Sequence, residues 1–273
     1  MTSVGPFSVH VVAVAIAALL AWLVTGWMQR GQQRDQQSSQ QKTAAGLFLD
    51  ALFAGLIAAR VGYIARWWPE YAAAPKSIIA LGDGGFYWWV GVPVAVAFAW
   101  WKSRRMPGLR RPLLAGMTVG MLAWGAAQGG LALLQRTAPP LSALQLHTID
   151  TVPVALSRYT GKPVVVNLWA TWCPPCRREM PILAQAQAEY PGVTFLMINQ
   201  GENAPTVQAF LAQQGLTFGH VLLDPSLSAM HLFGSRGLPT TLFFDANGKL
   251  VESHMGEITA ARLKDSLKNH SSP

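Results

Sequence analysis

The sequence has little charge. Only 12% of its 273 residues are Asp, Glu, Lys or Arg, whereas 51% are hydrophobic and 11 are Trp. Soluble domains usually carry about 25% charged residues. Trp is enriched where helices meet the two surfaces of a membrane. The composition therefore excludes a wholly soluble chain and indicates membrane-spanning segments.

One half of the chain has no excess of basic residues. From Thr137 onward there are 9 Lys and Arg and 9 Asp and Glu, whereas up to Arg136 there are 12 basic residues against 4 acidic ones. A nucleic-acid-binding face would cluster basic residues on a folded domain. Here they lie between apolar runs, so we expect no nucleic acid as a partner and relate the charge to membrane topology.

Cysteine is nearly absent, and its two copies are Cys173 and Cys176. Two neighbouring cysteines cannot form a disulfide framework. A structural metal site usually needs four ligands, commonly from a second Cys pair or a His pair at defined spacing, and the sequence has neither. We therefore expect no metal and no cofactor. The remaining interpretations are a redox-active pair and two buried cysteines packed as small hydrophobic residues.

Four apolar runs each approach the roughly 20 residues that cross a hydrocarbon core. They extend over about His10–Met28, Ala44–Trp68, Phe86–Trp101 and Leu113–Leu134. The first run follows no basic segment and ends in no cleavage pattern, so we interpret it as a retained span and not as a removed signal peptide. This pattern predicts a membrane region over residues 1–136.

Basic loops predict the orientation of these spans, because Lys and Arg near span ends stay in the cytoplasm. The loops after the first and third spans are the richest in them: Arg30, Arg34, Lys42, Lys102, Arg104, Arg105, Arg110 and Arg111. Placing both loops inside puts the C-terminal domain outside the cytoplasm after four crossings. If the third run is not a span, the domain would lie in the cytoplasm instead.

After a linker at residues 137–142, the pattern changes to short apolar runs and amphipathic stretches. We expect strands at Pro163–Ala170, Val193–Asn199 and Phe218–Leu223, helices at Pro174–Tyr190, Ala204–Gln214, Ser226–Phe233 and Thr259–Lys268, and a hairpin of Thr240–Phe244 and Leu250–Ser253. The hairpin is expected to turn at Asn247-Gly248, because Asn-Gly supplies two residues with positive φ. This order predicts an α/β domain with a mixed sheet over residues 143–273.

Cys173 lies where the predicted strand Pro163–Ala170 ends and the next helix begins. Free N–H groups and the helix dipole at that place favour a thiolate, which is the nucleophilic form of cysteine. Cys176 follows one helical turn later, close enough to resolve a mixed disulfide. We therefore predict that Cys173 attacks a disulfide and that Cys176 completes the exchange. The chemistry runs in both directions, so a reductase and a disulfide-forming oxidase both stay open.

Two stretches, GKPVVVNLWATWCPPCRREMP from Gly161 and GLPTTLFFDANGKL from Gly237, resemble the TlpA/ResA branch of the thioredoxin-like superfamily. The resemblance implies a thioredoxin-like fold and an extracytoplasmic thiol–disulfide reductase, anchored to the bacterial inner membrane with its domain in the periplasm. Substrates would be disulfide-bearing periplasmic proteins, including haem-attachment cysteines in cytochrome c maturation. A membrane thiol-shuttling electron donor would return the pair to its reduced form.

The same resemblance implies further residues of the site. A cis-proline at Pro239 would oppose the cysteines, and Leu238 before it would touch substrate. Glu179 matches an acidic residue near the thiols, which would raise a thiol pKa or carry a proton; the alternative is a first-turn glutamate that interacts with the helix dipole. The site is completed by Trp172, Pro174 and Pro175, of which Pro175 fits the family and Pro174 removes a backbone donor beside the thiolate.

Two other chemistries on this fold are not favoured. Copper chaperones combine a wider cysteine spacing with a distal histidine, and His231 is more simply explained as a surface helix residue. A peroxidase would need its cysteine in a different strand–helix context.

Part of the membrane region resembles the prolipoprotein diacylglyceryl transferase family. The matching residues are Ala59-Arg60-Val61-Gly62-Tyr63, preceded by Ala54-Gly55, and Gly82-Asp83-Gly84-Gly85-Phe86. In that family related glycines and an arginine shape a lipid headgroup site, so the resemblance implies a lipid site at Arg60 and Tyr63 and membrane lipid as a partner. Phe86-Tyr87-Trp88-Trp89 stands where the family has a His-containing stretch.

Two interpretations of this membrane region stay open. Arg60 is either functional, as ionisable residues inside spans often are, or a packing or snorkelling arginine. A rival function for the whole protein is a lipid-binding or lipid-transferring membrane protein whose thioredoxin-like module only docks partners.

Overall fold

The structure is a computed structural model, and it describes all residues except 1–2, 5–6, 33–43, 105–106, 136–138 and 271–273. The predicted topogenic residues Arg34, Lys42 and Arg105, and the start of the predicted linker, lie outside the described residues. The chain divides into two compact units. A helical unit comprises Val9–Ile78 and Gly85–Ala132, and a sheet unit comprises Met1–Ser8, Ile79–Gly84 and Leu133–Pro273.

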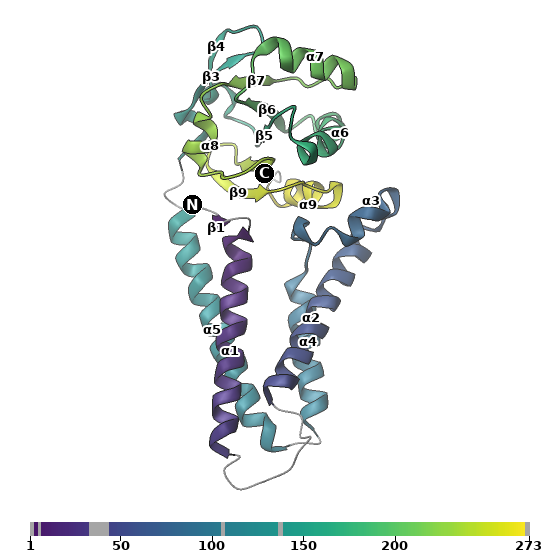
Figure 1. Cartoon of the computed structure of the whole chain (residues 1–273), viewed down its shortest axis with the longest axis vertical. Coiled ribbons are helices and arrows are strands. Elements are labelled where there is room, and N and C mark those ends of the chain that lie inside the picture. Colours follow the sequence, from purple (N-terminus) through teal and green to yellow (C-terminus); the bar gives the residue numbers. More distant parts are fainter. Residues whose placement is uncertain (1–2, 5–6, 33–43, 105–106, 136–138, 271–273) are drawn as a thin grey trace. The chain divides into compact units, whose positions relative to one another are not determined.

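The helical unit is built from four helices that overlap the four predicted apolar runs (Figure 1). They are α1 (Val9–Gln32), α2 (Ala44–Arg66), α4 (Trp88–Ser103) and α5 (Arg110–Gln135). Short elements stand between them along the chain: α3 (Trp68–Ala73), η1 (Pro75–Ile79), η2 (Leu81–Asp83) and η3 (Pro107–Leu109). Among the described residues, α2 alone is long and apolar enough to cross a membrane, and Ala13–Met28 is apolar but shorter. The number of crossings therefore stays a prediction.

Small residues allow these helices to approach closely. A Cβ added at Gly91 on α4 would lie 2.7 Å from the carbonyl oxygen of Gly55 on α2 and 2.9 Å from the Cβ of Ala59. A Cβ added at Gly116 on α5 would lie 2.7 Å from the carbonyl oxygen of Ala21 on α1. Van der Waals packing at such contacts is a main source of helix association where the surroundings are as apolar as the helices themselves.

The sheet unit contains a seven-stranded sheet in the order β4-β3-β7-β6-β5-β8-β9. Its strands are β3 (Gln145–Thr148), β4 (Pro153–Ala155), β5 (Val164–Trp169), β6 (Thr194–Gln200), β7 (Val221–Asp224), β8 (Thr240–Phe244) and β9 (Leu250–Met255). β5, β6 and β7 are parallel, and the other pairings are antiparallel. The predicted mixed sheet is confirmed. The strands β3 and β4, which extend the sheet beyond β7, were not expected from the sequence, and neither was the two-stranded sheet of β1 (Ser3–Val4) and β2 (Phe7–Ser8).

Hydrophobic cores lie on both faces of this sheet. Val165 and Trp169 of β5 contribute to one core, whereas Val164, Val166 and Leu168 contribute to the other, because successive side chains of a strand point to opposite faces. The first core includes residues of α6 (Pro174–Glu189), α7 (Ala204–Gln214) and α9 (Ala260–His270). The second includes residues of α8 (Ser228–Phe233), η4 (Leu141–Ala143) and η5 (Leu156–Tyr159). Burial on both faces explains the continuous apolar run of β5.

The β8–β9 hairpin is present, but its turn differs from the expected one. Of Asn247 and Gly248, only Gly248 has a positive φ, at 75°. The Asp245 carboxylate accepts hydrogen bonds from the N–H groups of Asn247 and Lys249, both at 2.9 Å. The expected Asn-Gly pair with two positive φ angles is therefore wrong. The aspartate side chain stabilises a longer loop, as Asp commonly does in turns.

Candidate active site

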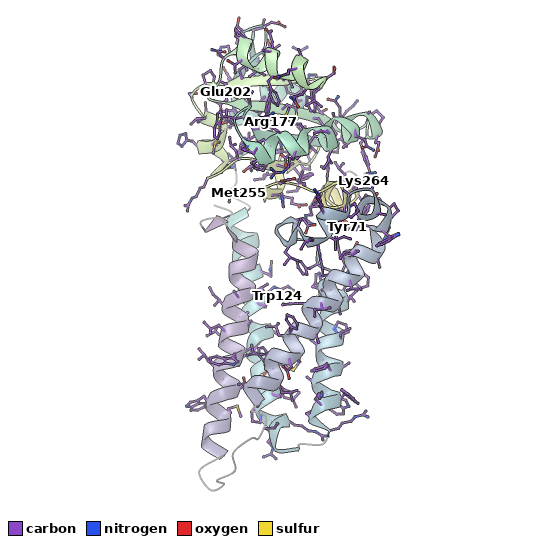
Figure 2. The ribbon with its side chains drawn as sticks, turned by 45° about the vertical axis from the view of Figure 1, so that its right-hand side comes forward. Tyr71, Trp124, Arg177, Glu202, Met255 and Lys264 are labelled. Atoms are coloured by element: carbon purple, nitrogen blue, oxygen red, sulfur yellow. A yellow bond between two sulfur atoms is a disulfide. The ribbon has the colours of Figure 1, made fainter. Side chains whose placement is uncertain are left out.

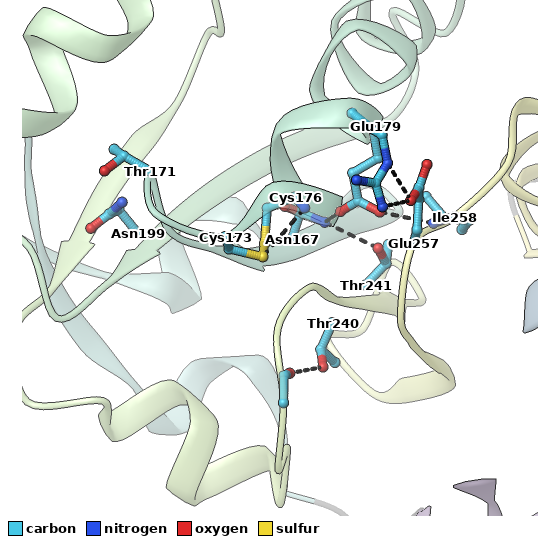
Figure 3. The surroundings of a disulfide bond; sticks show 12 residues. Asn167, Thr171, Cys173, Cys176, Glu179, Asn199, Thr240, Thr241, Glu257 and Ile258 are labelled. Carbon is cyan, nitrogen blue, oxygen red and sulfur yellow. Dashed lines mark hydrogen bonds and ion pairs between the residues drawn. A yellow bond between two sulfur atoms is a disulfide. The ribbon is translucent and has the colours of Figure 1, made fainter. Parts of the chain in front are cut away.

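Cys173 and Cys176 form a disulfide at the start of α6, with Cα atoms 5.3 Å apart (Figure 3). Cys173 is the N-cap residue of the helix, and its Sγ accepts a hydrogen bond from the N–H of Cys176 at 3.3 Å. Pro174 and Pro175 have no N–H, so this is the first backbone donor that the helix offers. The same donor and the helix dipole would stabilise a thiolate at Cys173 once the disulfide is reduced.

The two cysteines differ slightly in exposure. Cys173 is 3% exposed and Cys176 is fully buried. Trp172, directly before them, is 68% exposed and is among the exposed large hydrophobic residues of the sheet unit. Cys173 therefore lies slightly nearer the surface than Cys176, directly after a residue with an exposed apolar ring.

Pro239 lies at the same end of the sheet as the disulfide. Thr240, the first residue of β8, pairs with Leu168 near the end of β5, so Pro239 falls one position further along towards Cys173. The peptide bond between Leu238 and Pro239 is cis, the geometry that the family resemblance implied. Leu238 is partly buried and packs against both cores.

Glu179 lies on α6, three residues after Cys176, and is completely buried. Its Oε1 accepts a hydrogen bond from the Asn167 side-chain amide at 2.7 Å, and its Oε2 accepts one from the N–H of Ile258 at 2.8 Å (Figure 3). Burial raises the pKa of Glu179 to about 8, although both hydrogen bonds act to lower it. Interaction with the helix dipole does not require this burial, and the role of Glu179 near the thiols stays a prediction.

Several residues of this region were not expected from the sequence. Asn167 places its amide between Glu179 and the hydroxyl of Thr241, to which it donates at 3.1 Å. The sequence does contain one indication of this role, because Asn167 is the only polar residue in the apolar run PVVVNLWA. Glu202 accepts two hydrogen bonds from Thr171, just before the cysteines. Nothing in the sequence around Glu202 indicated that contact, because it forms only when β5 and β6 lie side by side.

No group of three or more His, Cys, Asp and Glu that could hold a metal occurs among the residues that the structure describes. His231 lies on α8 and is exposed.

In the helical unit, Arg60 and Tyr63 of α2 are both buried. The Arg60 guanidinium donates hydrogen bonds to the carbonyl oxygens of Gly85 and Ile78, both at 3.0 Å, and of Ser77 at 3.3 Å. The rings of Tyr71 and Phe86 lie 5.4 and 5.6 Å from its Cζ. The structure thus brings Arg60 and Tyr63 together with the Gly85 segment. These three hydrogen bonds of the Arg60 guanidinium therefore go to backbone carbonyl groups of the helical unit itself.

Two family models match the chain, and they divide it near its middle. Residues 135–267 match the redoxin family, and residues 1–136 match the prolipoprotein diacylglyceryl transferase family.

Two thiol-disulfide oxidoreductases are similar to the second half of the chain. The thiol-disulfide oxidoreductase ResA of Halalkalibacterium halodurans is 34% identical over 125 residues, which cover 45% of this chain and 70% of the relative. The protein of the same name from Geobacillus thermodenitrificans is 37% identical over 116 residues, covering 42% of this chain and 66% of the relative. The crystal structure of a putative thiol:disulfide interchange protein DsbE from Chlorobium tepidum is 31% identical, covers 50% of this chain and 95% of that chain, and has a TM-score of 0.44.

Proposed function

The chain belongs to the ResA family of thiol–disulfide oxidoreductases, and we propose that it is a membrane-anchored enzyme that reduces protein disulfides outside the cytoplasm. The observation that carries the proposal is the Cys173–Cys176 disulfide at the N-terminus of α6, with the buried carboxyl group of Glu179 in the same helix. A nucleophile, a resolving thiol and a titrating group together are sufficient for disulfide exchange.

The proposed reaction begins with the reduced enzyme. The Cys173 thiolate attacks one sulfur of a substrate disulfide, forms a mixed disulfide and releases the second substrate sulfur, which takes up a proton. Cys176 then gives its proton to ionised Glu179 and attacks the Cys173 sulfur. The remaining substrate sulfur leaves as a thiolate and takes the proton from Glu179, so the substrate departs as a dithiol and Glu179 is ionised again. The two electrons that the substrate gained come from the enzyme, which is left with the Cys173–Cys176 disulfide.

Three apolar residues are proposed to hold the substrate during this exchange. Trp172 is exposed beside Cys173, and Leu238 and Pro239 lie at the same end of the sheet. Backbone groups on either side of Pro239 would pair with an extended substrate segment, while the Trp172 ring covers its apolar side chains. A protein disulfide would use all of these contacts, whereas a small disulfide would use few of them.

The direction of the reaction is tested by the redox state of the pair in growing cells. We expect Cys173 and Cys176 to be mostly reduced, because a membrane thiol shuttle would keep supplying electrons to a reductase. Rapid acid quenching followed by a thiol-alkylating mass tag should shift most of the protein by two tags, since the chain has no other cysteine. A mostly oxidised pair would contradict the reductase and favour a disulfide-forming oxidase. Haem-attachment cysteines in cytochrome c maturation are the substrate class to examine first.

The proposed location is the bacterial inner membrane, with the sheet unit in the periplasm. In a background of Cys173→Ser and Cys176→Ser, Val152→Cys would place one thiol at an exposed position of the sheet unit. We expect a membrane-impermeant maleimide to label it in intact spheroplasts. As a matched control, Gly108→Cys in the basic loop after α4 should be labelled only after permeabilisation. The opposite pattern would place the redox site in the cytoplasm.

Lipid binding by the helical unit is a second candidate function, favoured by the family match over residues 1–136. The hydrogen bonds of Arg60 to Ser77, Ile78 and Gly85 give this residue a role in holding the segment after α3 in place. A lipid-linked phenotype that survives replacement of both cysteines would favour a lipid function independent of disulfide exchange.

A further inference from the structure

Glu202 makes a contact with the active-site segment that the reaction above does not use. It follows β6, at a turn where Gly201 has a φ of 79°, in the sheet unit (Figure 2). Its Oε2 accepts a hydrogen bond from the N–H of Thr171 at 2.7 Å, and its Oε1 accepts one from the Thr171 hydroxyl at 2.5 Å. Asn199, in β6, donates a third hydrogen bond to Oε2 at 2.7 Å.

This arrangement fixes both the position and the direction of the Thr171 backbone. Two donors from one residue bind two oxygens of one carboxylate, which restrains rotation as well as distance. Asn199 is completely buried and holds the carboxylate from the strand side. Figure 3 shows the Thr171 and Asn199 side chains close together at the end of the two strands. The segment between β5 and α6 is thereby tied to β6.

The hydrogen bonds of Glu202 to Thr171 mainly restrain Trp172, because other hydrogen bonds already hold Cys173 in place. Cys173 is the N-cap of α6, its Sγ accepts from the N–H of Cys176, and its own N–H donates to the carbonyl of Ala170 at 3.3 Å. Trp172 stands between Thr171 and Cys173 with a largely exposed ring. The direction of that ring depends on the backbone on both sides of it, and Glu202 fixes one side.

We propose that Glu202 is a positioning residue that holds Trp172 ready to dock a polypeptide substrate beside Cys173. The inference rests on the proposed function, since it concerns the same exchange reaction. It adds a specificity: the favoured substrate is a disulfide in a polypeptide with apolar side chains near its cysteines. Small disulfides do not cover the Trp172 ring, so the hydrogen bonds of Glu202 should hardly change the rate at which they react. An aromatic anchor that is already ordered loses less entropy when it binds.

The test compares a protein disulfide with a small one, using full-length protein in detergent, with insulin and glutathione disulfide as substrates. For Glu202→Ala we expect kcat/KM with insulin to fall about tenfold, as for loss of a well-held interface aromatic. The rate with glutathione disulfide should stay within about twofold of wild type, a difference within ordinary surface effects. Glu202→Gln, which keeps one acceptor oxygen, should lie between wild type and Glu202→Ala. Glu189→Gln removes a carboxylate at the other end of α6 and should match wild type.

A double-mutant cycle with Trp172→Ala shows whether Glu202 acts through the ring. In the Trp172→Ala background, Glu202→Ala should lower the insulin rate by less than about twofold, because the ring that it positions is gone. A full tenfold loss in that background, or an equal loss with both substrates, would overturn the inference. If Glu202→Ala is unstable, Thr171→Val supplies the same test, because it removes the hydroxyl bond and keeps the backbone one.

The same measurements distinguish a failure of the proposed function from a failure of the positioning role of Glu202. Wild-type protein that does not reduce insulin contradicts the function itself. Wild-type protein that reduces insulin as fast as Glu202→Ala does contradicts only the positioning role.

Discussion

Replacing Cys173 with serine should lower disulfide reduction by on the order of 10³-fold or more, because the hydroxyl cannot replace the attacking thiolate. Cys173 is the more exposed cysteine of the pair and the N-cap of α6, so an incoming disulfide meets it first. The measurement is the rate of insulin reduction by full-length protein in detergent, supplied with dithiothreitol. A rate close to wild type in Cys173→Ser would contradict the assignment of the nucleophile.

Cys176→Ser should fail in a different way. Cys173 still attacks, but no thiol remains to resolve the product, so mixed disulfides with substrate proteins should accumulate. They would appear as reducible higher-mass bands on non-reducing gels. The matched control carries both substitutions and should give none, because the chain has no third cysteine. Absence of adducts from Cys176→Ser in cells would count heavily against the proposed reaction sequence.

Glu179→Gln should remove a large pH dependence from the stability of the oxidised protein. Burial raises the pKa of Glu179 from 4.5 to about 8 in the folded protein. Between these values the folded state holds a proton that the unfolded state has released, so the free energy of unfolding falls as pH rises. Each pKa unit corresponds to ~1.4 kcal/mol, and the wild type should therefore lose several kcal/mol on going from pH 4.5 to pH 8. Glutamine stays neutral and should show no such loss.

The measurement is the thermal midpoint of the oxidised full-length protein at several pH values, compared between wild type and Glu179→Gln. From pH 5 to pH 8 the thermal midpoint of the wild type should fall relative to that of the variant, whatever the offset that the lost acceptor oxygen causes at low pH. Glu189→Gln is the matched control on the same helix. The hydrogen bond from Lys264 lowers the pKa of Glu189. Glu189 is therefore ionised throughout this pH range, and replacing it should not change how stability depends on pH. Parallel curves for wild type and Glu179→Gln would contradict the raised pKa.

The same substitution should slow the reaction. Without a carboxylate to accept the Cys176 proton, resolution of the mixed disulfide should be about 10²-fold slower, a usual contribution of general base catalysis. Mixed disulfides should then be detectable at short times even with both cysteines present. Because burial raises the pKa of Glu179 to about 8, we expect a step near pH 8 in the activity profile of the wild type, and this step should be absent from the variant. An unchanged rate and profile would reduce Glu179 to a structural residue.

Much of the fold follows from local sequence pattern. The run PVVVNLWA predicted β5, the Cys-Pro-Pro-Cys segment predicted the start of α6, and the four apolar runs predicted the four longest helices of the helical unit. Errors arose where longer-range contacts decide the structure. The strands β3 and β4 are too short and too mixed in composition to stand out, and they form because β7 offers an edge to β3, which in turn pairs with β4. In the hairpin, the Asp245 carboxylate changed the turn expected from Asn247-Gly248.

The sequence by itself determined where the redox pair lies in its helix. The separation of three residues between Cys173 and Cys176, and the end of β5 just before them, are both properties of the local sequence. It did not determine what surrounds the pair. Glu179 meets Asn167 from 12 positions away and Ile258 from 79, and Glu202 meets Thr171 across 31. Hydrogen bonds between such distant groups, and the burial that raises a carboxyl pKa, exist only after the sheet and its helices have packed. The tertiary structure therefore decided the electrostatics of the site, while the local sequence decided where its two cysteines lie.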